Sequence, residues 1–269
     1  MFSRWSFRLT FEIRHVFIAV IALLITSNAF SASRALNAVT LEYPPYEFSV
    51  DGKAQGIAVE IIEEAVRRTN GNSINFTFLP WKRAVYSVKS GQGDILFNAG
   101  KNEERQQWGR YGENVLILQK YVLFKKRNAK IQVNPHFNNV KNYSIAVRLG
   151  YLYGSGNFKD ALNENKFSRV SDSKSTKQSV DMLLGDRIDL FVGDYLPVMH
   201  YLKSNGLEEN IDIVKRSDIN TDNLVVLVWP TYMLFNKDNV SESYIEQVNQ
   251  AMTQMKSDGF IDAVFERYK

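Results

Sequence analysis

The chain has 269 residues, of which 45% are hydrophobic and 23% are charged, so it can form one large or two smaller globular domains with real cores. Its formal net charge of +4 includes no block of basic residues, which argues against nucleic acid as a partner. The absence of cysteine excludes disulfides and a lipid-modified cysteine.

Residues 1–31 have the order typical of a secretory signal peptide: arginines, then an apolar run, then small residues. The apolar stretch 16–30 is shorter than the roughly 20 residues that a membrane-spanning helix needs, so we favour cleavage over a retained anchor. Cleavage after Ser31 would leave Ala29 and Ser31 at the positions that must be small. We therefore expect an exported mature protein without a lipid anchor.

The first half of the mature chain alternates short apolar runs with amphipathic segments. This pattern predicts a βαβαβ unit, with strands over 38–43, 74–79 and 94–100 and helices over 56–71 and 81–91. The sequence is therefore typical of an α/β fold.

A second α/β unit begins after residues 121–127. Its predicted strands cover 143–150 and 189–194, and its predicted helices cover 155–165 and 175–187. The apolar runs 121–126 and 223–237 remain outside both units, and a helical stretch over 241–268, interrupted near Asp258 and Gly259, closes the chain. Two lobes of similar architecture would account for this repetition.

Arg105 occupies an unusual position near the start of a predicted helix. Asn102 is a good N-cap, and an arginine three residues later faces the positive end of the helix dipole. Arg105 follows the strand that ends at Gly100, and Asp194 directly follows Gly193 at the end of another strand. Ligands of open α/β sheets bind beyond such carboxyl ends, so both charges are predicted to face one cleft.

Several quoted segments, in their order, resemble the bacterial extracellular solute-binding proteins of family 3, the polar amino-acid type that supplies ABC transporters. The segments are "EYPPYEF", "GIAVEIIEEA", "FLPWKRAVYSVKSGQGDILFNAGKNEER" and "DLFVGDY". The resemblance implies a two-lobed periplasmic binding protein, type II-like, with two crossover strands at the hinge. Lobe 1 would then consist of residues 36–124 and 229–269, and lobe 2 of residues 125–228.

The resemblance also implies the ligand-binding residues. The family's carboxylate-binding arginine falls on Arg105 and its ammonium-binding aspartate on Asp194. The flanking aromatic pair falls on Tyr43 and Trp81. The strand end that meets the ligand falls on Asn98, Ala99 and Gly100, and the helix start of the second lobe falls on Gly150, Tyr151 and Leu152.

Each of these residues also has a simpler interpretation. For Arg105 it is a solvated side chain, as in most helical arginines, and for Asp194 it is a turn-forming residue. For Trp81, which continues an apolar stripe, it is core packing, and for Tyr43 it is a ring that covers the Pro-Pro turn that follows. We therefore treat these residues as candidates until geometry brings them together.

The chain also departs from the family pattern. Serine or threonine is usual where this chain has Tyr151, Leu152 and Asn102. Extra cations flank the site, of which Arg83 is a candidate ligand contact, whereas Lys82 and Arg148 are predicted to lie on the surface. Three ligand classes therefore remain as alternatives: a plain α-amino acid, an acidic ligand, and a carboxylate without an amine.

We expect a monomeric, non-enzymatic periplasmic protein that captures a small polar solute, an amino acid or related carboxylate, for an inner-membrane ABC permease. No phosphate loop, dinucleotide motif or metal-ligand spacing predicts a cofactor or metal. One alternative is an enzyme similar to cyclohexadienyl dehydratases, with Glu42 or Glu47 as general acid or base. The other is a soluble sensor that partners a receptor.

Overall fold

The computed structural model describes residues 35–69, 73–151, 153–219 and 222–268, so the predicted signal peptide lies outside the described residues. The main sheet contains two groups of parallel strands. One group is β4, β1 and β5, at Ile74–Phe78, Leu36–Thr40 and Ile95–Gly100. The other is β10, β9 and β11, at Arg169–Ser173, Ser144–Arg148 and Leu190–Asp194.

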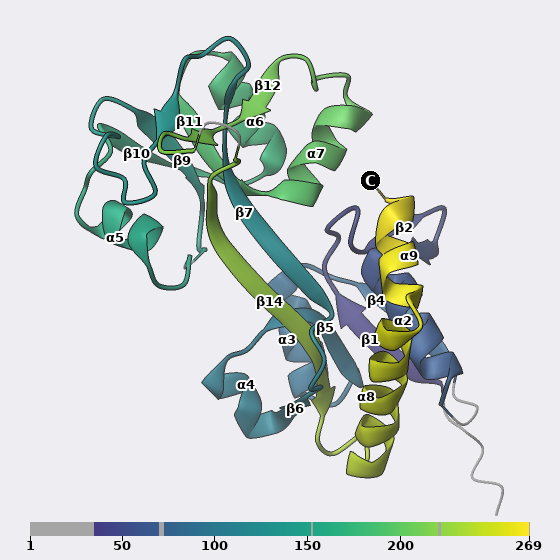
Figure 1. The fold of residues 1–269 in the computed structure, drawn as a ribbon. Coiled ribbons are helices and arrows are strands. Elements are labelled where there is room, and N and C mark those ends of the chain that lie inside the picture. Colours follow the sequence, from purple (N-terminus) through teal and green to yellow (C-terminus); the bar gives the residue numbers. More distant parts are fainter. Residues whose placement is uncertain (1–34, 70–72, 152, 220–221, 269) are drawn as a thin grey trace, which may run out of the picture. The chain divides into compact units, whose positions relative to one another are not determined.

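Two long strands join these groups (Figure 1). They are β7 (Ile117–Lys126) and β14 (Val225–Asn236), which pair with each other in antiparallel orientation. β7 also pairs with β11, and β14 also pairs with β5, so the strand order is β10-β9-β11-β7-β14-β5-β1-β4. The apolar run 223–237 therefore forms a strand that crosses from one parallel group to the other.

Helices follow most of the parallel strands, as the alternation of the sequence predicts. Their bounds are α2 Ile57–Arg67, α3 Trp81–Lys89, α4 Glu103–Trp108, α5 Asn157–Asn163, α6 Thr176–Leu184, α7 Tyr195–Ser204, α8 Glu242–Ser257 and α9 Phe260–Arg267. The break between α8 and α9 falls at Asp258 and Gly259, where Gly259 has φ 79°, a left-handed conformation that favours glycine. Short strands complete the fold: β2 Phe48–Val50, β3 Lys53–Gln55, β6 Gly109–Tyr111, β8 Gln132–Val133, β12 Ile211–Ile213 and β13 Lys215–Arg216.

Buried apolar side chains gather on two sides of the β7–β14 pair. We call the clusters built from residues 36–117 and 233–264 the first core, and the clusters built from residues 121–224 the second core. The amphipathic stripe of α2 lies in the first core, where Ile61, Ile62 and Ala65 have no exposed surface. Both cores belong to one compact unit, Ala35–Lys269.

The structure confirms a mixed α/β fold, the predicted βαβαβ elements of the first half, and the two strands and two helices predicted for the second unit. It also contains elements that the sequence analysis did not predict, among them β10, α7 and the β2–β3 hairpin. None of the helices described is long and apolar enough to cross a membrane.

Candidate functional site

Two adjoining pockets lie where the parallel strands end beside β7 and β14. The wide pocket has a volume of about 350 Å³ and is lined by Trp81, Asn98, Gly100, Arg105, Trp229 and further residues of both cores. The narrow pocket has a volume of about 20 Å³, room for roughly one water-sized group, and includes Arg148 and Asp194. Four tyrosines line both pockets, so the two spaces adjoin: Tyr43, Tyr121, Tyr151 and Tyr153.

Arg105 lines the wide pocket, and its unusual helix position now has an explanation. The Asn102 side chain caps α4 by accepting from the Arg105 backbone N–H at 3.1 Å, as the sequence predicts. The guanidinium turns back to the strand end, where Nη1 donates to the Gly100 carbonyl oxygen at 3.0 Å. It also lies over the Trp81 ring, 5.2 Å from the centroid. Arg105 is thereby held against the pocket wall.

Trp81 serves the core and the pocket together. It begins α3, packs against the first core and lines the wide pocket. Arg83, two residues later, is exposed and lines neither pocket. Successive side chains on a helix point about 100° apart, so one helix cannot direct both residues to the same place. Arg83 therefore lies outside both pockets of this structure.

Asn98 anchors the end of β5 through buried hydrogen bonds. Its backbone has φ 54°, a left-handed conformation that asparagine tolerates better than most residues. Its side-chain amide donates to Glu47 Oε1 at 2.7 Å, and its Oδ1 accepts from Gln119 at 3.2 Å and Thr231 at 2.6 Å. Because Gln119 belongs to β7 and Thr231 to β14, this network ties both long strands to the wall at Gly100.

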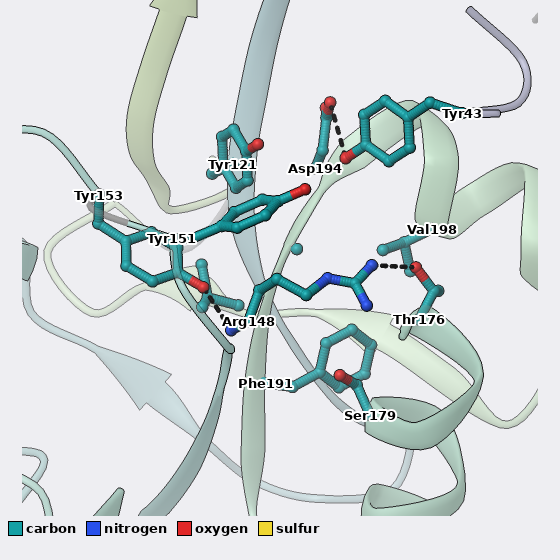
Figure 2. A pocket seen from close by; sticks show the side chains of 12 residues that line it. Tyr43, Tyr121, Arg148, Tyr151, Tyr153, Thr176, Ser179, Phe191, Asp194 and Val198 are labelled. Atoms are coloured by element: carbon teal, nitrogen blue, oxygen red, sulfur yellow. Dashed lines mark hydrogen bonds between the residues drawn. The ribbon is translucent and has the colours of Figure 1, made fainter. Parts of the chain in front are cut away.

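Asp194 ends β11 and has only 2% of its surface exposed. Its carboxylate accepts from the Tyr46 hydroxyl at 3.1 Å and from the Tyr43 hydroxyl at 3.5 Å (Figure 2 shows the latter bond). Burial raises the pKa of Asp194 to about 7, although the tyrosine hydrogen bonds oppose the rise. Burial and the nearby Asp194 raise the pKa of Tyr46 far above its ordinary value, so this hydroxyl keeps its proton and donates.

The loop after β9 differs from the expected helix start. Gly150 and Tyr151 precede α5, which begins only at Asn157, and Leu152 lies outside the described residues. The prediction of a helix start at these positions is therefore wrong for Gly150 and Tyr151. Tyr151 nevertheless lines both pockets with its ring, which lies 6.5 Å from the Tyr121 ring.

Two site residues were missed by the sequence analysis. Arg148 was predicted to lie on the surface, but it is half-buried and lines the narrow pocket (Figure 2). Trp229 lines the wide pocket from β14, and a Cβ on Gly100 would lie only 2.3 Å from its indole nitrogen. Glycine at position 100 therefore makes room for the indole, but a tryptophan in an apolar run gives no signal of this contact.

The carboxylates considered for an enzymatic role lie elsewhere. Neither Glu42 nor Glu47 lines either pocket. Glu42 is exposed, whereas Glu47 is fully buried behind Asn98, and burial raises its pKa well above the ordinary value. In the described part of the chain, no group of His, Asp and Glu side chains could hold a metal ion.

The two pockets are lined by aromatic rings and carry opposite charges, at Arg105 and at Asp194, beside the two long strands that join the cores. Such an arrangement is typical of a ligand-binding site. The chain belongs to the bacterial extracellular solute-binding proteins of family 3, whose model matches residues 36–269.

Individual relatives are distant. The L-cystine-binding protein TcyA of Bacillus subtilis (strain 168) is 24% identical over 216 residues, covering 80% of this chain and 73% of that protein. A probable histidine-binding protein of Campylobacter jejuni is 24% identical over 228 residues, covering 84% and 81%. The solved structure of an ancestral arginine-binding protein bound to arginine has a TM-score of 0.65 at 19% identity, covering 88% of this chain and 99% of that one. The likeness to that structure shows the shared fold.

Proposed function

We propose that the chain is a periplasmic binding protein that captures a small polar solute, an amino acid or a related carboxylate, and presents it to an ABC-type permease. The observation that carries this proposal is the Arg105 guanidinium, fixed on Trp81 at one wall of the wide pocket, with Asp194 in the adjoining narrow pocket. The relatives named as binding proteins for cystine and histidine support an amino acid as the ligand.

Arg105 would bind the ligand's carboxylate. A guanidinium has five N–H donors in a planar fork, and only one of them is bonded to Gly100. The remaining donors can meet both oxygens of a carboxylate, which a single ammonium cannot do in the same geometry. The stacking on Trp81 holds the fork in place, so little side-chain freedom is lost when the ligand binds.

Asp194 would bind the ligand's ammonium group. An ammonium close to a buried carboxylate favours its charged form, so it would reverse the rise that burial causes in the pKa of Asp194. Tyr43, Trp81 and Trp229 would cover the apolar part of the ligand. The pocket thus offers a site for each end of an amino acid.

The two long strands would form the hinge. β7 and β14 are the connection between the parallel groups, which supports a division into a lobe of residues 36–124 and 229–269 and a lobe of residues 125–228. Closure about these strands would exclude water and strengthen the contacts to both charges. The closed, monomeric form would then be the one that the permease recognises.

The test is a thermal-shift screen of the purified protein against amino acids and organic acids, followed by Arg105→Ala and Arg105→Lys. We expect one class of carboxylates to raise the melting temperature, Arg105→Ala to abolish that shift, and Arg105→Lys to keep only part of it. The melting temperatures without ligand show whether each variant folds. A full shift in a well-folded Arg105→Ala variant would contradict the proposal.

A further inference from the structure

Arg148 extends from the end of β9 into the narrow pocket, on the side of the second core. Its Nη2 donates to the Thr176 hydroxyl at the long distance of 3.4 Å, and its guanidinium lies 5.8 Å from the centre of the Tyr151 ring (Figure 2). Among the described residues, neither Arg148 nor Arg105 has a carboxylate oxygen within 4.0 Å. Most donors of the Arg148 fork are therefore available to a ligand.

Arg148 and Asp194 line the same narrow pocket without forming an ion pair. The Asp194 carboxylate is instead held by the Tyr46 and Tyr43 hydroxyls, which come from the other core. Two opposite charges that share a pocket and do not neutralise each other can each take a ligand group. The narrow pocket itself has room for about one water-sized group, so binding of both ligand groups requires the space between Arg148 and Asp194 to widen as the lobes move about the hinge.

The charged groups around the two pockets can now be compared with a ligand. Lys101 also lines the wide pocket, but it is exposed and its ammonium lies over the Tyr232 ring at 4.5 Å. The remaining groups are two guanidiniums, at Arg105 and Arg148, and one carboxyl, at Asp194. A plain α-amino acid with a neutral or cationic side chain would leave one guanidinium without a partner in a site that closure dries, which is costly.

We propose that Arg148 is a second carboxylate-binding residue and that the ligand is an acidic amino acid, with two carboxylates and one ammonium. This inference rests on the proposed function, because it assigns the ligand class of the same site. One carboxylate binds Arg105, the other binds Arg148, and the ammonium binds Asp194. The three charges of the ligand are then the complement of the three charges of the protein.

Isothermal titration of L-glutamate and L-aspartate against the wild-type protein and Arg148→Ala tests the inference. We expect one of these acids to bind and Arg148→Ala to weaken it about 10- to 100-fold, the range for a lost charge-assisted hydrogen bond. Arg148→Lys should retain part of the affinity. Arg187→Ala, which removes an exposed arginine of the same half that lines neither pocket, should bind like wild type.

Ligands that lack one carboxylate make the test specific. For glutamate these are glutamine, without the side-chain carboxylate, and isoglutamine, without the α-carboxylate. The loss of binding free energy from Arg148→Ala should be non-additive with the loss from one of these amides, and the loss from Arg105→Ala with the loss from the other. In each such pair, the variant and the amide remove the same contact from its two sides.

Additive losses with both amides, an unchanged affinity in Arg148→Ala, or no binding of either acid would overturn the inference. If a neutral or basic amino acid binds instead and Arg105→Ala abolishes that binding, the proposed function stands and only the assignment of Arg148 fails. If no carboxylate depends on Arg105, both proposals fail.

Discussion

The two oppositely charged residues on which the proposed function rests differ in how the protein holds them. Arg105, on the side of the first core, is half-exposed and is fixed by a backbone carbonyl and a tryptophan ring. Asp194, on the side of the second core, is almost fully buried and is held by two tyrosine hydroxyls from the opposite core. Burial makes the charge of Asp194 unfavourable until a cation arrives. Selection for an ammonium should therefore depend on Asp194.

The largest expected effect of this difference is on stability as a function of pH. The pKa of Asp194 is about 7 in the folded protein against an ordinary value of 3.8, so the folded state binds more protons between these values. The free energy of unfolding should then fall as the pH rises from about 4 to 7, by at most about 4 kcal/mol from this residue. Asp194→Asn, which cannot ionise, should remove this part of the fall in urea unfolding experiments without ligand.

The matched control is Asp172→Asn, which changes an exposed aspartate on β10, a strand of the same parallel group as β11. Burial also raises the pKa of Glu47, so this residue too lowers the free energy of unfolding as the pH rises. The free energy of unfolding of Asp194→Asn should therefore depend less on pH than that of wild type, but should still fall. Equal pH profiles for wild type and Asp194→Asn would show that Asp194 is solvated or paired in solution.

A smaller effect should distinguish the two tyrosines. The Tyr46 hydroxyl lies 3.1 Å from Asp194 and the Tyr43 hydroxyl 3.5 Å, so Tyr46→Phe removes the stronger bond. At pH 8, where Asp194 is charged, Tyr46→Phe should lower the free energy of unfolding by about 1–2 kcal/mol and Tyr43→Phe by about half as much. At pH 5 both losses should shrink, because the carboxyl is then neutral. An equal loss from both variants at pH 8 would contradict the assigned geometry.

Most of the fold could be predicted from the sequence because its elements are strongly periodic. The apolar stripe of α2 and the break at Gly259 each follow from local chemistry. The α7 helix was missed because it begins directly at the strand end, with Asp194 as its N-cap residue and without a loop to separate the two elements. The β2–β3 hairpin was missed because each strand has only three residues.

The candidate site was only partly predictable. Arg105 could be singled out because its charge opposes the helix dipole, and the structure places it in the wide pocket. The tyrosine hydroxyls at Asp194 could not be predicted, because residues 43 and 46 are 148 or more positions away from it in the chain. Arg148 was placed on the surface because nothing in its local sequence shows that β9 ends at a pocket.

The smallest expected effect concerns Arg83, which is two residues from Trp81 in the sequence but lines neither pocket. Arg83 and Arg105 have the same side chain, but only the Arg105 guanidinium lies over Trp81 and lines the wide pocket. Arg83→Ala should therefore change ligand affinity by less than about twofold, since exposed charges outside a site contribute at most a few tenths of a kcal/mol under physiological salt. Titration of the best ligand from the thermal-shift screen, at low and at physiological salt, measures this effect. A tenfold loss in Arg83→Ala that persists at physiological salt would mean that α3 turns this residue toward the ligand on binding, and the contrast with Arg105 would then hold only for the ligand-free protein.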